Sequence, residues 1–534
     1  MDISKRCHIF YEILFFLFMC TSCTEINSFV AKEKVNNILN KQVLCKDCNV
    51  IFISLTNVRS DHLGVYGYSR NTSPVIDSFA KKSIVFDNAY SVSSWTLSSA
   101  VSLYTSTYPF AHRVISRYPI NDKIVISKLP DRIITLIDIL NKNGYETASF
   151  NGSWDYDPKF GLTGRFKSNF PVLVENKGLW AQQGSIRSMF PHIENWLTQN
   201  KDRPFFVHIQ AYDAHCPFAY PEENRMFDRN YTGSIDFSYC YWTFDRIRPT
   251  FILKNGKLKK FFSLMSGGRV PPIWKKFLTN RDLQHMIALY DGEIFNLDSL
   301  IGKIFYKLKT LRLLNKTIIV LFSEHGDMFG EHGRVMRGGP LRGTFYDDVL
   351  HVPLIIYHPH LKHKRIKALV SLIDIAPTIL DFLGINPPGE FKGKSFIPLL
   401  TGEKDVIRDY VFAGSMYITS SDENSIFRYS TLVASVRNSS WKLIKEIVKY
   451  SDRTNVWYEL FDKRRDPYEL KNVALDHFER LEELNSVLES WLNSFSVKEE
   501  FFNLKHVILY TPSKDGGYAQ MMCKDTYEDV CPVP

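Results

Sequence analysis

Two short polar segments carry residue types that chemistry at a buried site would need. One contains Asn57 and follows the apolar run at 49–55, and the other contains Glu324 and His325 and follows the run at 317–322. Ligands of open α/β sheets bind beyond the carboxyl ends of the strands, so these residues meet if the two strands are neighbours. Amide and carboxylate oxygens with an imidazole nitrogen can hold a divalent cation, which makes all three candidate metal ligands. Taken one at a time, each is more often a surface loop residue.

The elements that would position these segments alternate between buried strands and amphipathic helices. Continuous apolar runs, typical of strands buried on both faces, lie at residues 49–55, 204–209, 317–322 and 352–357. Helical spacing of apolar residues occurs at residues 133–143, 283–308 and 372–383, and glycine follows the first and the last. This alternation predicts an α/β fold with a large, mostly parallel central sheet flanked by helices.

The chain divides into a main domain and smaller parts. Residues 48–407 form the main domain, and within it residues 218–280 are rich in Tyr, Phe, Arg and Lys without clear periodicity. We interpret that segment as a variable excursion over the loop end of the sheet, where a substrate would be selected. Shorter strands and a helix at 478–495 predict a small C-terminal α+β subdomain over residues 408–500, followed by a tail at 501–534.

The first 23 residues are typical of a targeting segment. Lys5 and Arg6 precede an apolar stretch at 9–19, which is short for a membrane span of about 20 residues, so a secretory signal is the better interpretation. Cys23 follows two small residues and could be a lipid-attachment cysteine of the lipoprotein type. An uncleaved anchor is the competing interpretation. The protein is therefore expected to be exported, and to be periplasmic, membrane-anchored through its N-terminus or extracellular.

Cysteine usage and charge argue against a cysteine zinc site and against nucleic-acid binding. Nine cysteines suit an exported protein, and the Cys45-x-x-Cys48 pair has no second pair at zinc-site spacing. Cys523 and Cys531 could close a disulfide loop or remain free thiols. The net charge of +9 is diffuse, and short basic runs such as 257–260 have no aromatic pattern around them. A solvated basic surface is the preferred interpretation, so no nucleic-acid partner is expected.

Ordered motifs run through most of the chain. The opening block is Val58-Arg-Ser-Asp-His-Leu-Gly-Val-Tyr-Gly67, and later blocks lie at residues 71–77, 86–90, 96–109, 212–217, 289–293, 324–333, 343–347, 352–354, 372–378 and 458–462. In this order they resemble the sulfatase group of the alkaline-phosphatase superfamily over residues 48–475, apart from the excursion. The resemblance implies an alkaline-phosphatase-like fold for the main domain and hydrolysis of an anionic ester.

The resemblance implies that Thr96 occupies the nucleophile position, since the run at 96–109 aligns with the family's nucleophile motif. Most sulfatases carry a cysteine or serine there that is converted to formylglycine. Threonine cannot form that aldehyde, so no formylglycine is expected, and a threonine alkoxide would form a covalent ester that water hydrolyses. Relatives with threonine include phosphonate and phosphodiester hydrolases and phosphoglycerol transferases, which keeps phosphate esters open as substrates. Without the resemblance, Thr96 would be interpreted as a helix N-cap.

The resemblance also assigns roles to other positions. His215 would be the acid for the leaving group, and Arg342 would clamp the anionic ester through two oxygens. A Ca²⁺ or Mg²⁺ ion would be held where this chain has Thr56, Asn57, Glu324 and His325. Thr56 and Asn57 replace acidic ligands, and because charge count drives affinity for hard cations, such a site binds weakly. Ala100 replaces the Arg or His that orients the nucleophile.

The sequence therefore predicts a sulfatase-like hydrolase of sulfate or phosphate esters with a threonine nucleophile and a divalent metal. Its substrate would be a sulfated or phosphorylated glycan, lipid or small molecule. One alternative is a catalytically weak or inactive relative that binds anionic ligands. The other is a transferase that moves a phosphate-containing group.

Overall fold

A computed structural model describes most of the chain. The described residues are 43–115, 117–120, 123–171, 184–216, 218, 226–233, 248–254, 257–263, 279–333, 345–419, 429–450, 454–495, 507–512 and 518–522. The expected targeting segment, Arg342, Cys523 and Cys531 lie outside these residues.

The central sheet has eight strands in the order β12-β2-β11-β10-β1-β7-β5-β6. Their bounds are β1 Asn49–Leu55, β2 Ile84–Tyr90, β5 Glu146–Asn151, β6 Ser168–Pro171, β7 Phe205–Ala211, β10 Thr317–Phe322, β11 Leu354–Tyr357 and β12 Lys364–Ser371. β1 pairs in parallel with both β10 and β7, and β11 is antiparallel to its neighbours β10 and β2. The predicted mostly parallel sheet is confirmed.

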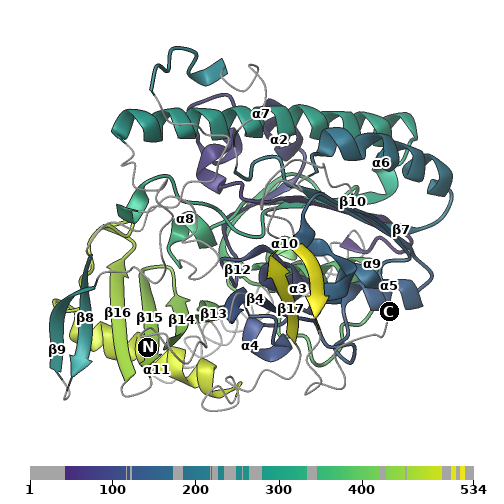
Figure 1. Ribbon diagram of the computed structural model, residues 1–534. Coiled ribbons are helices and arrows are strands. Elements are labelled where there is room, and N and C mark those ends of the chain that lie inside the picture. Colours follow the sequence, from purple (N-terminus) through teal and green to yellow (C-terminus); the bar gives the residue numbers. More distant parts are fainter. Residues whose placement is uncertain are drawn as a thin grey trace, which may run out of the picture.

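Helices cover both faces of this sheet (Figure 1). The helices are α2 Pro74–Ala80, α3 Thr96–Thr105, α4 Pro109–His112, α5 Leu136–Lys142, α6 Ile186–Asn200, α7 Asn280–Thr310, α8 Asp347–Leu350, α9 Ile375–Leu383, α10 Ile397–Thr401 and α11 Phe478–Asn493. Val50 and Phe52 of β1 belong to the core shared with α3, α5 and α9. Ile51 and Ile53 belong to the opposite core, shared with α2, α6 and α7. Since successive strand residues point to opposite faces, one buried strand feeds both cores.

Two predicted helix ends are explained by the residues beside them. α9 ends where Gly384 takes φ 71°, a left-handed conformation that glycine adopts without steric cost. α5 begins at residue 136 instead of 133, because Thr135 caps it and forms a capping box with Asp138.

The C-terminal part forms a second, antiparallel sheet of six strands, in the order β13-β14-β15-β16-β8-β9. The bounds are β8 Arg248–Lys254, β9 Lys257–Ser263, β13 Val411–Thr419, β14 Tyr429–Arg437, β15 Trp441–Tyr450 and β16 Thr454–Asp462. α11 packs on it through a shared apolar cluster that includes Leu443, Leu488 and Trp491. The hairpin β8–β9, which comes from the variable excursion, extends this sheet beyond β16. Sequence reasoning assigned no strand to that segment.

A small third sheet joins the tail to the main domain. Its order is β18-β17-β4-β3, with β3 Arg117–Ile120, β4 Lys123–Ser127, β17 Val507–Pro512 and β18 Tyr518–Met522. Within the described residues, Cys45 and Cys48 form a disulfide, and Cys216 is also disulfide-bonded. Every helix in the described residues is too short or too polar to cross a bilayer.

Candidate active site

The two polar segments identified in the sequence follow the carboxyl-terminal ends of two neighbouring strands in the middle of the central sheet. β1 and β10 are parallel neighbours, with Asn49 opposite Thr317 and Ser54 opposite Phe322. Asn57 follows the end of β1, and Glu324 and His325 follow the end of β10, so their expected proximity is confirmed. The side chains of Asn57, Glu324 and His325 are fully buried.

Thr96 joins this group from the first turn of α3. Its hydroxyl oxygen Oγ1 lies 2.9 Å from Nε2 of His325, and Nδ1 of His325 lies 2.9 Å from the carbonyl oxygen of Gly326. A carbonyl oxygen only accepts, so in the neutral ring Nδ1 carries the hydrogen and Nε2 accepts the hydroxyl hydrogen of Thr96. Trp95 is the N-cap residue of α3 and makes no side-chain cap bond. The Thr96 hydroxyl is therefore directed at an imidazole, and not used as a helix cap.

Glu324 has a different set of partners. Its Oε1 accepts hydrogen bonds from the Ser54 hydroxyl and, at 2.8 Å, from the Tyr156 hydroxyl. Its Oε2 accepts one from Thr56 Oγ1 at 3.1 Å. Thr56 Oγ1 in turn accepts from Gln210 Nε2 at 3.2 Å. Burial raises the pKa of Glu324, and the hydroxyl donors oppose that rise.

The strand pattern explains why these groups meet. Ser54 and Thr56 continue the face of β1 that carries Phe52, and Glu324 continues the face of β10 that carries Phe322. Tyr156 enters from a short 3-10 turn, Trp154–Tyr156, which follows β5. We name Ser54, Thr56, Tyr156 and Glu324 the Glu324 cluster.

Asn57 adopts φ 71°, a left-handed conformation that asparagine tolerates better than most residues. Its amide nitrogen Nδ2 donates to Asp327 Oδ2 at 2.8 Å. The nitrogen end of this amide, which cannot bind a cation, therefore faces the nearest carboxylate.

The predicted metal ligands do not converge on one point. Asn57 is bonded to Asp327, His325 to Thr96 and Gly326, and Glu324 to three hydroxyls. Among the residues that the structure describes, no group of three or more His, Cys, Asp or Glu side chains is placed to hold a metal. In this arrangement the side chains do not fit a divalent cation, and we derive no catalytic step through one.

His215 lies at the same sheet edge, beyond the end of β7. Its side chain is 3% exposed, Nδ1 donates to the Cys216 carbonyl oxygen at 2.6 Å, and its ring stacks on Tyr212 with centroids 4.3 Å apart. The segment is tied to β1, because Thr56 N donates to the Ala211 carbonyl oxygen at 3.0 Å. Arg342, the predicted anion clamp, lies outside the described residues. Ala100 is buried in the core under α3.

Other buried polar groups lie beside the Glu324 cluster. The ring of His208 lies 5.7 Å from that of Tyr104 and 5.1 Å from that of Tyr156. Within the described part of the chain, the Tyr104 hydroxyl, both ring nitrogens of His208 and Oε1 of Gln210 have no hydrogen-bond partner. Burial lowers the pKa of His208 to about 3, so its ring is neutral. These buried polar atoms are of the kind that ordered water often satisfies.

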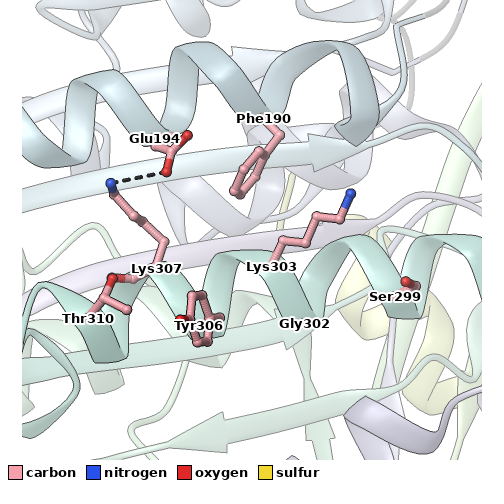
Figure 2. Close-up of a pocket in the computed structure, with 8 residues that line it drawn as sticks. All are labelled: Phe190, Glu194, Ser299, Gly302, Lys303, Tyr306, Lys307 and Thr310. Atoms are coloured by element: carbon pink, nitrogen blue, oxygen red, sulfur yellow. Dashed lines mark hydrogen bonds and ion pairs between the residues drawn. The ribbon is translucent and has the colours of Figure 1, made fainter.

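A groove between α6 and α7 is unrelated to this chemistry (Figure 2). It has a volume of about 420 Å³ and is lined by Phe190, Glu194, Ser299, Gly302, Lys303, Tyr306, Lys307 and Thr310. Lys307 Nζ pairs with Glu194 at 3.1 Å across it. None of the candidate site residues lines this groove, which lies on the helical layer away from α3 (Figure 1).

Sequence reasoning missed Ser54, Tyr156 and Asp327 as neighbours of the site. Ser54 could have been found, because strand alternation puts it on the same face as Thr56. Asp327 lies within a recognised motif. Tyr156 has no comparable signal, since its position depends on the path of the chain after β5.

Comparisons with known proteins agree with this architecture. The family model described as Sulfatase matches residues 48–385, and the model described as N-sulphoglucosamine sulphohydrolase, C-terminal matches residues 341–498. Arylsulfatase K of Xenopus laevis is 25% identical over 480 residues, which cover 84% of this chain and 83% of the relative. Arylsulfatase K of Mus musculus is 27% identical over 413 residues, which cover 73% of this chain and 71% of the relative.

Solved structures share the fold. The phosphonate monoester hydrolase of Agrobacterium radiobacter aligns with a TM-score of 0.61 at 21% identity, over 84% of this chain and 96% of that chain. A 2-O GAG sulfatase aligns with a TM-score of 0.63 at 19% identity, over 86% of this chain and 94% of that chain. The sulfatase family model matches more than half of this chain, which therefore belongs to the sulfatase family of hydrolases.

Proposed function

We propose that this protein hydrolyses sulfate or phosphate esters with Thr96 Oγ1 as the nucleophile. The observation that carries the proposal is the 2.9 Å hydrogen bond from Thr96 Oγ1 to Nε2 of His325. A hydroxyl is a weak nucleophile at neutral pH, and an adjacent base whose other nitrogen is held in place is the usual means of activating it. His325 meets that description, because Gly326 fixes its Nδ1.

The first step forms a covalent ester. Thr96 passes its hydroxyl proton to Nε2 of His325 as Oγ1 forms a bond to the sulfur or phosphorus atom of the substrate. The bond from that atom to the leaving oxygen breaks, and the leaving oxygen takes a proton from His215. The products of this step are the free alcohol and a sulfated or phosphorylated Thr96.

The second step restores the enzyme. Water attacks the sulfur or phosphorus atom and gives its proton to His215, which now acts as a base. The bond to Thr96 Oγ1 breaks, and that oxygen regains its proton from His325. Inorganic sulfate or phosphate leaves, and both histidines return to their starting protonation states. Arg342 would neutralise the anionic group in both steps.

Relatives suggest which esters to test. The curated relatives are named arylsulfatase K, and solved structures of the same fold include a 2-O GAG sulfatase and a phosphonate monoester hydrolase. Another solved structure of this fold is that of a protein in complex with its substrate, D-glucosamine-2-N,6-O-disulfate. We therefore propose a sulfated sugar as the first substrate class and a phosphate ester as the rival.

Export is part of the proposal. The Cys45–Cys48 disulfide and the disulfide-bonded Cys216 support it, since disulfides persist mainly in oxidising compartments. The signal expected within residues 1–23 is consistent with this location.

A binding protein without turnover is the second candidate. It is favoured by Ala100, which is buried in the core at the position where the family resemblance implies an Arg or His that orients the nucleophile. The two candidates are separated by turnover. The mature protein, isolated with its native disulfides, is assayed on an aryl sulfate, an aryl phosphate, an aryl phosphodiester and a sulfated disaccharide.

The enzyme proposal predicts product from at least one ester, with a faster rate for the preferred class, and Thr96→Ala abolishes it. Thr96→Ser keeps a hydroxyl and is the matched control, so it retains part of the rate. Binding of these compounds without product, or turnover that is equal in Thr96→Ala, would contradict the enzyme proposal.

A further inference from the structure

The family resemblance implies a divalent cation at Thr56, Asn57, Glu324 and His325. These residues follow the ends of β1 and β10. We propose that this protein holds no divalent cation there, because the Glu324 cluster fills the position with a network of hydroxyls around one carboxyl group. The inference goes beyond the proposed function and does not depend on it, since it concerns what the folded protein binds and not what it turns over.

The first argument is the number of hydroxyl donors on Glu324. Oε1 accepts from the hydroxyls of Ser54 and Tyr156, and Oε2 accepts from that of Thr56, so hydrogens point at both carboxyl oxygens. A cation needs the same lone pairs and is repelled by the hydrogens. A carboxylate has about four lone-pair positions, and these three donors leave one of them, on Oε2. A cation that used both oxygens of Glu324 would displace buried hydroxyl hydrogen bonds.

The second argument is the direction of the neighbouring amides. Gln210 turns its Nε2 to Thr56 Oγ1 at 3.2 Å, and Asn57 turns its Nδ2 to Asp327 at 2.8 Å. Both amides thus direct hydrogens, and not carbonyl oxygens, at the groups beside the carboxyl. His325 already uses both ring nitrogens, one on Thr96 and one on Gly326.

The third argument is charge. Ca²⁺ and Mg²⁺ sites in proteins are built from several oxygen ligands, and carboxylate count sets their affinity. Thr56 supplies no charge where the resemblance implies an acidic ligand, and the Glu324 cluster has one carboxyl group. The next carboxylate, that of Asp327, already accepts a hydrogen bond from Asn57 Nδ2. Moving a divalent ion into a fully buried place carries a large desolvation cost, which the single carboxylate of the cluster does not offset.

The test uses the folded mature protein without substrate. Metal content is measured by mass spectrometry of the protein purified without chelators, and thermal unfolding is followed in EDTA and with added Ca²⁺ or Mg²⁺. The proposal predicts far less than one equivalent of metal and the same unfolding temperature in all three solutions. A stoichiometric divalent ion, or an unfolding temperature that EDTA lowers, would overturn it.

Two variants make the test specific. Thr56→Asp puts a second carboxylate beside Glu324, so the two repel each other without a cation, and added Ca²⁺ or Mg²⁺ is expected to raise the unfolding temperature. Thr56→Ser keeps the hydroxyl and is expected to show no response. A rise of the unfolding temperature with added Ca²⁺ or Mg²⁺ in Thr56→Ser as large as that in Thr56→Asp would show that the position takes a cation without a second carboxylate, and would overturn the inference. An inactive wild-type protein would sink the proposed function and leave these readouts unchanged.

Discussion

Thr96 and Thr56 both lie near the carboxyl-terminal ends of the central strands, yet their hydroxyls have chemically different partners. Thr96 Oγ1 donates to the imidazole Nε2 of His325 at 2.9 Å, which is a base able to take its proton. Thr56 Oγ1 lies between Gln210 Nε2 at 3.2 Å and Glu324 Oε2 at 3.1 Å, and its hydrogen is donated to a carboxyl group. In the proposed function the first arrangement prepares a nucleophile, whereas the second contributes hydrogen bonds to the fold. The proposal thus gives the same residue type two purposes, which the hydrogen-bond partner distinguishes.

The largest expected effect separates the two threonines directly. Thr96→Val and Thr56→Val each remove one hydroxyl with little change in shape. We expect Thr96→Val to lower kcat/KM roughly 10³-fold or more, because the nucleophile is lost. Thr56→Val should cost about 1–3 kcal/mol of unfolding free energy through the unmade hydrogen bonds. Ester hydrolysis and urea unfolding measure both, and equal losses of activity would remove the distinction between them.

The second effect concerns the base. Replacing His325 with glutamine keeps an acceptor for the Thr96 hydroxyl but cannot take its proton, so we expect a fall in kcat of about 10²–10⁴-fold. The acidic limb of the pH–rate profile should disappear as well. His112→Gln is the matched control, since His112 is a buried histidine bonded at 2.8 Å to Ser102, which lies on α3 toward the end opposite Thr96. A wild-type profile in His325→Gln would show that His325 is not the base.

The third effect is on stability alone. Glu324→Leu leaves the hydroxyls of Ser54, Thr56 and Tyr156 without their acceptor, at about 1–3 kcal/mol for each unsatisfied group. Glu324→Gln retains a carbonyl oxygen and should lose less. Chemical denaturation of the two variants measures the difference. Equal stability of Glu324→Leu and wild type would mean that the cluster does not hold this part of the sheet.

The smallest effect concerns His208, the buried histidine beside the Glu324 cluster. The folded-state pKa of His208 is about 3, below its ordinary 6.5, so the unfolded chain binds a proton that the folded chain rejects. Stability is therefore lost as pH falls below 6.5, by about 2 kcal/mol at about pH 5. His208→Phe, which suits the ring's aromatic neighbours Tyr104 and Tyr156, should remove that part of the loss. An unchanged difference in stability between neutral and acidic solution would contradict the assignment.

Much of the fold was predictable because buried strands leave a strong sequence signal. The runs that became β1 and β10 are buried at every residue, and their pairing brought Asn57, Glu324 and His325 together as expected. The hairpin β8–β9 was not predicted, since its residues have no clear periodicity and its place depends on pairing with β16.

The partners within the site could not be predicted in the same way. The pattern suggested that Glu324 and His325 serve one ion, whereas the structure gives them separate hydroxyl partners. That outcome depends on side-chain direction and on Tyr156, which comes from a turn far away in sequence. Motif spacing fixes which residues reach the sheet edge, and short-range hydrogen bonding decides what each of them does there.

The most direct test of the account is the fate of Thr96 during turnover. Rapid mixing with an aryl ester, followed by quenching and peptide mass spectrometry, measures both phenol release and modification of Thr96. We predict a burst of phenol stoichiometric with the enzyme and a sulfated or phosphorylated Thr96 peptide, both absent in Thr96→Val. Steady turnover with an unmodified Thr96 and no burst, retained in Thr96→Val, would contradict the account.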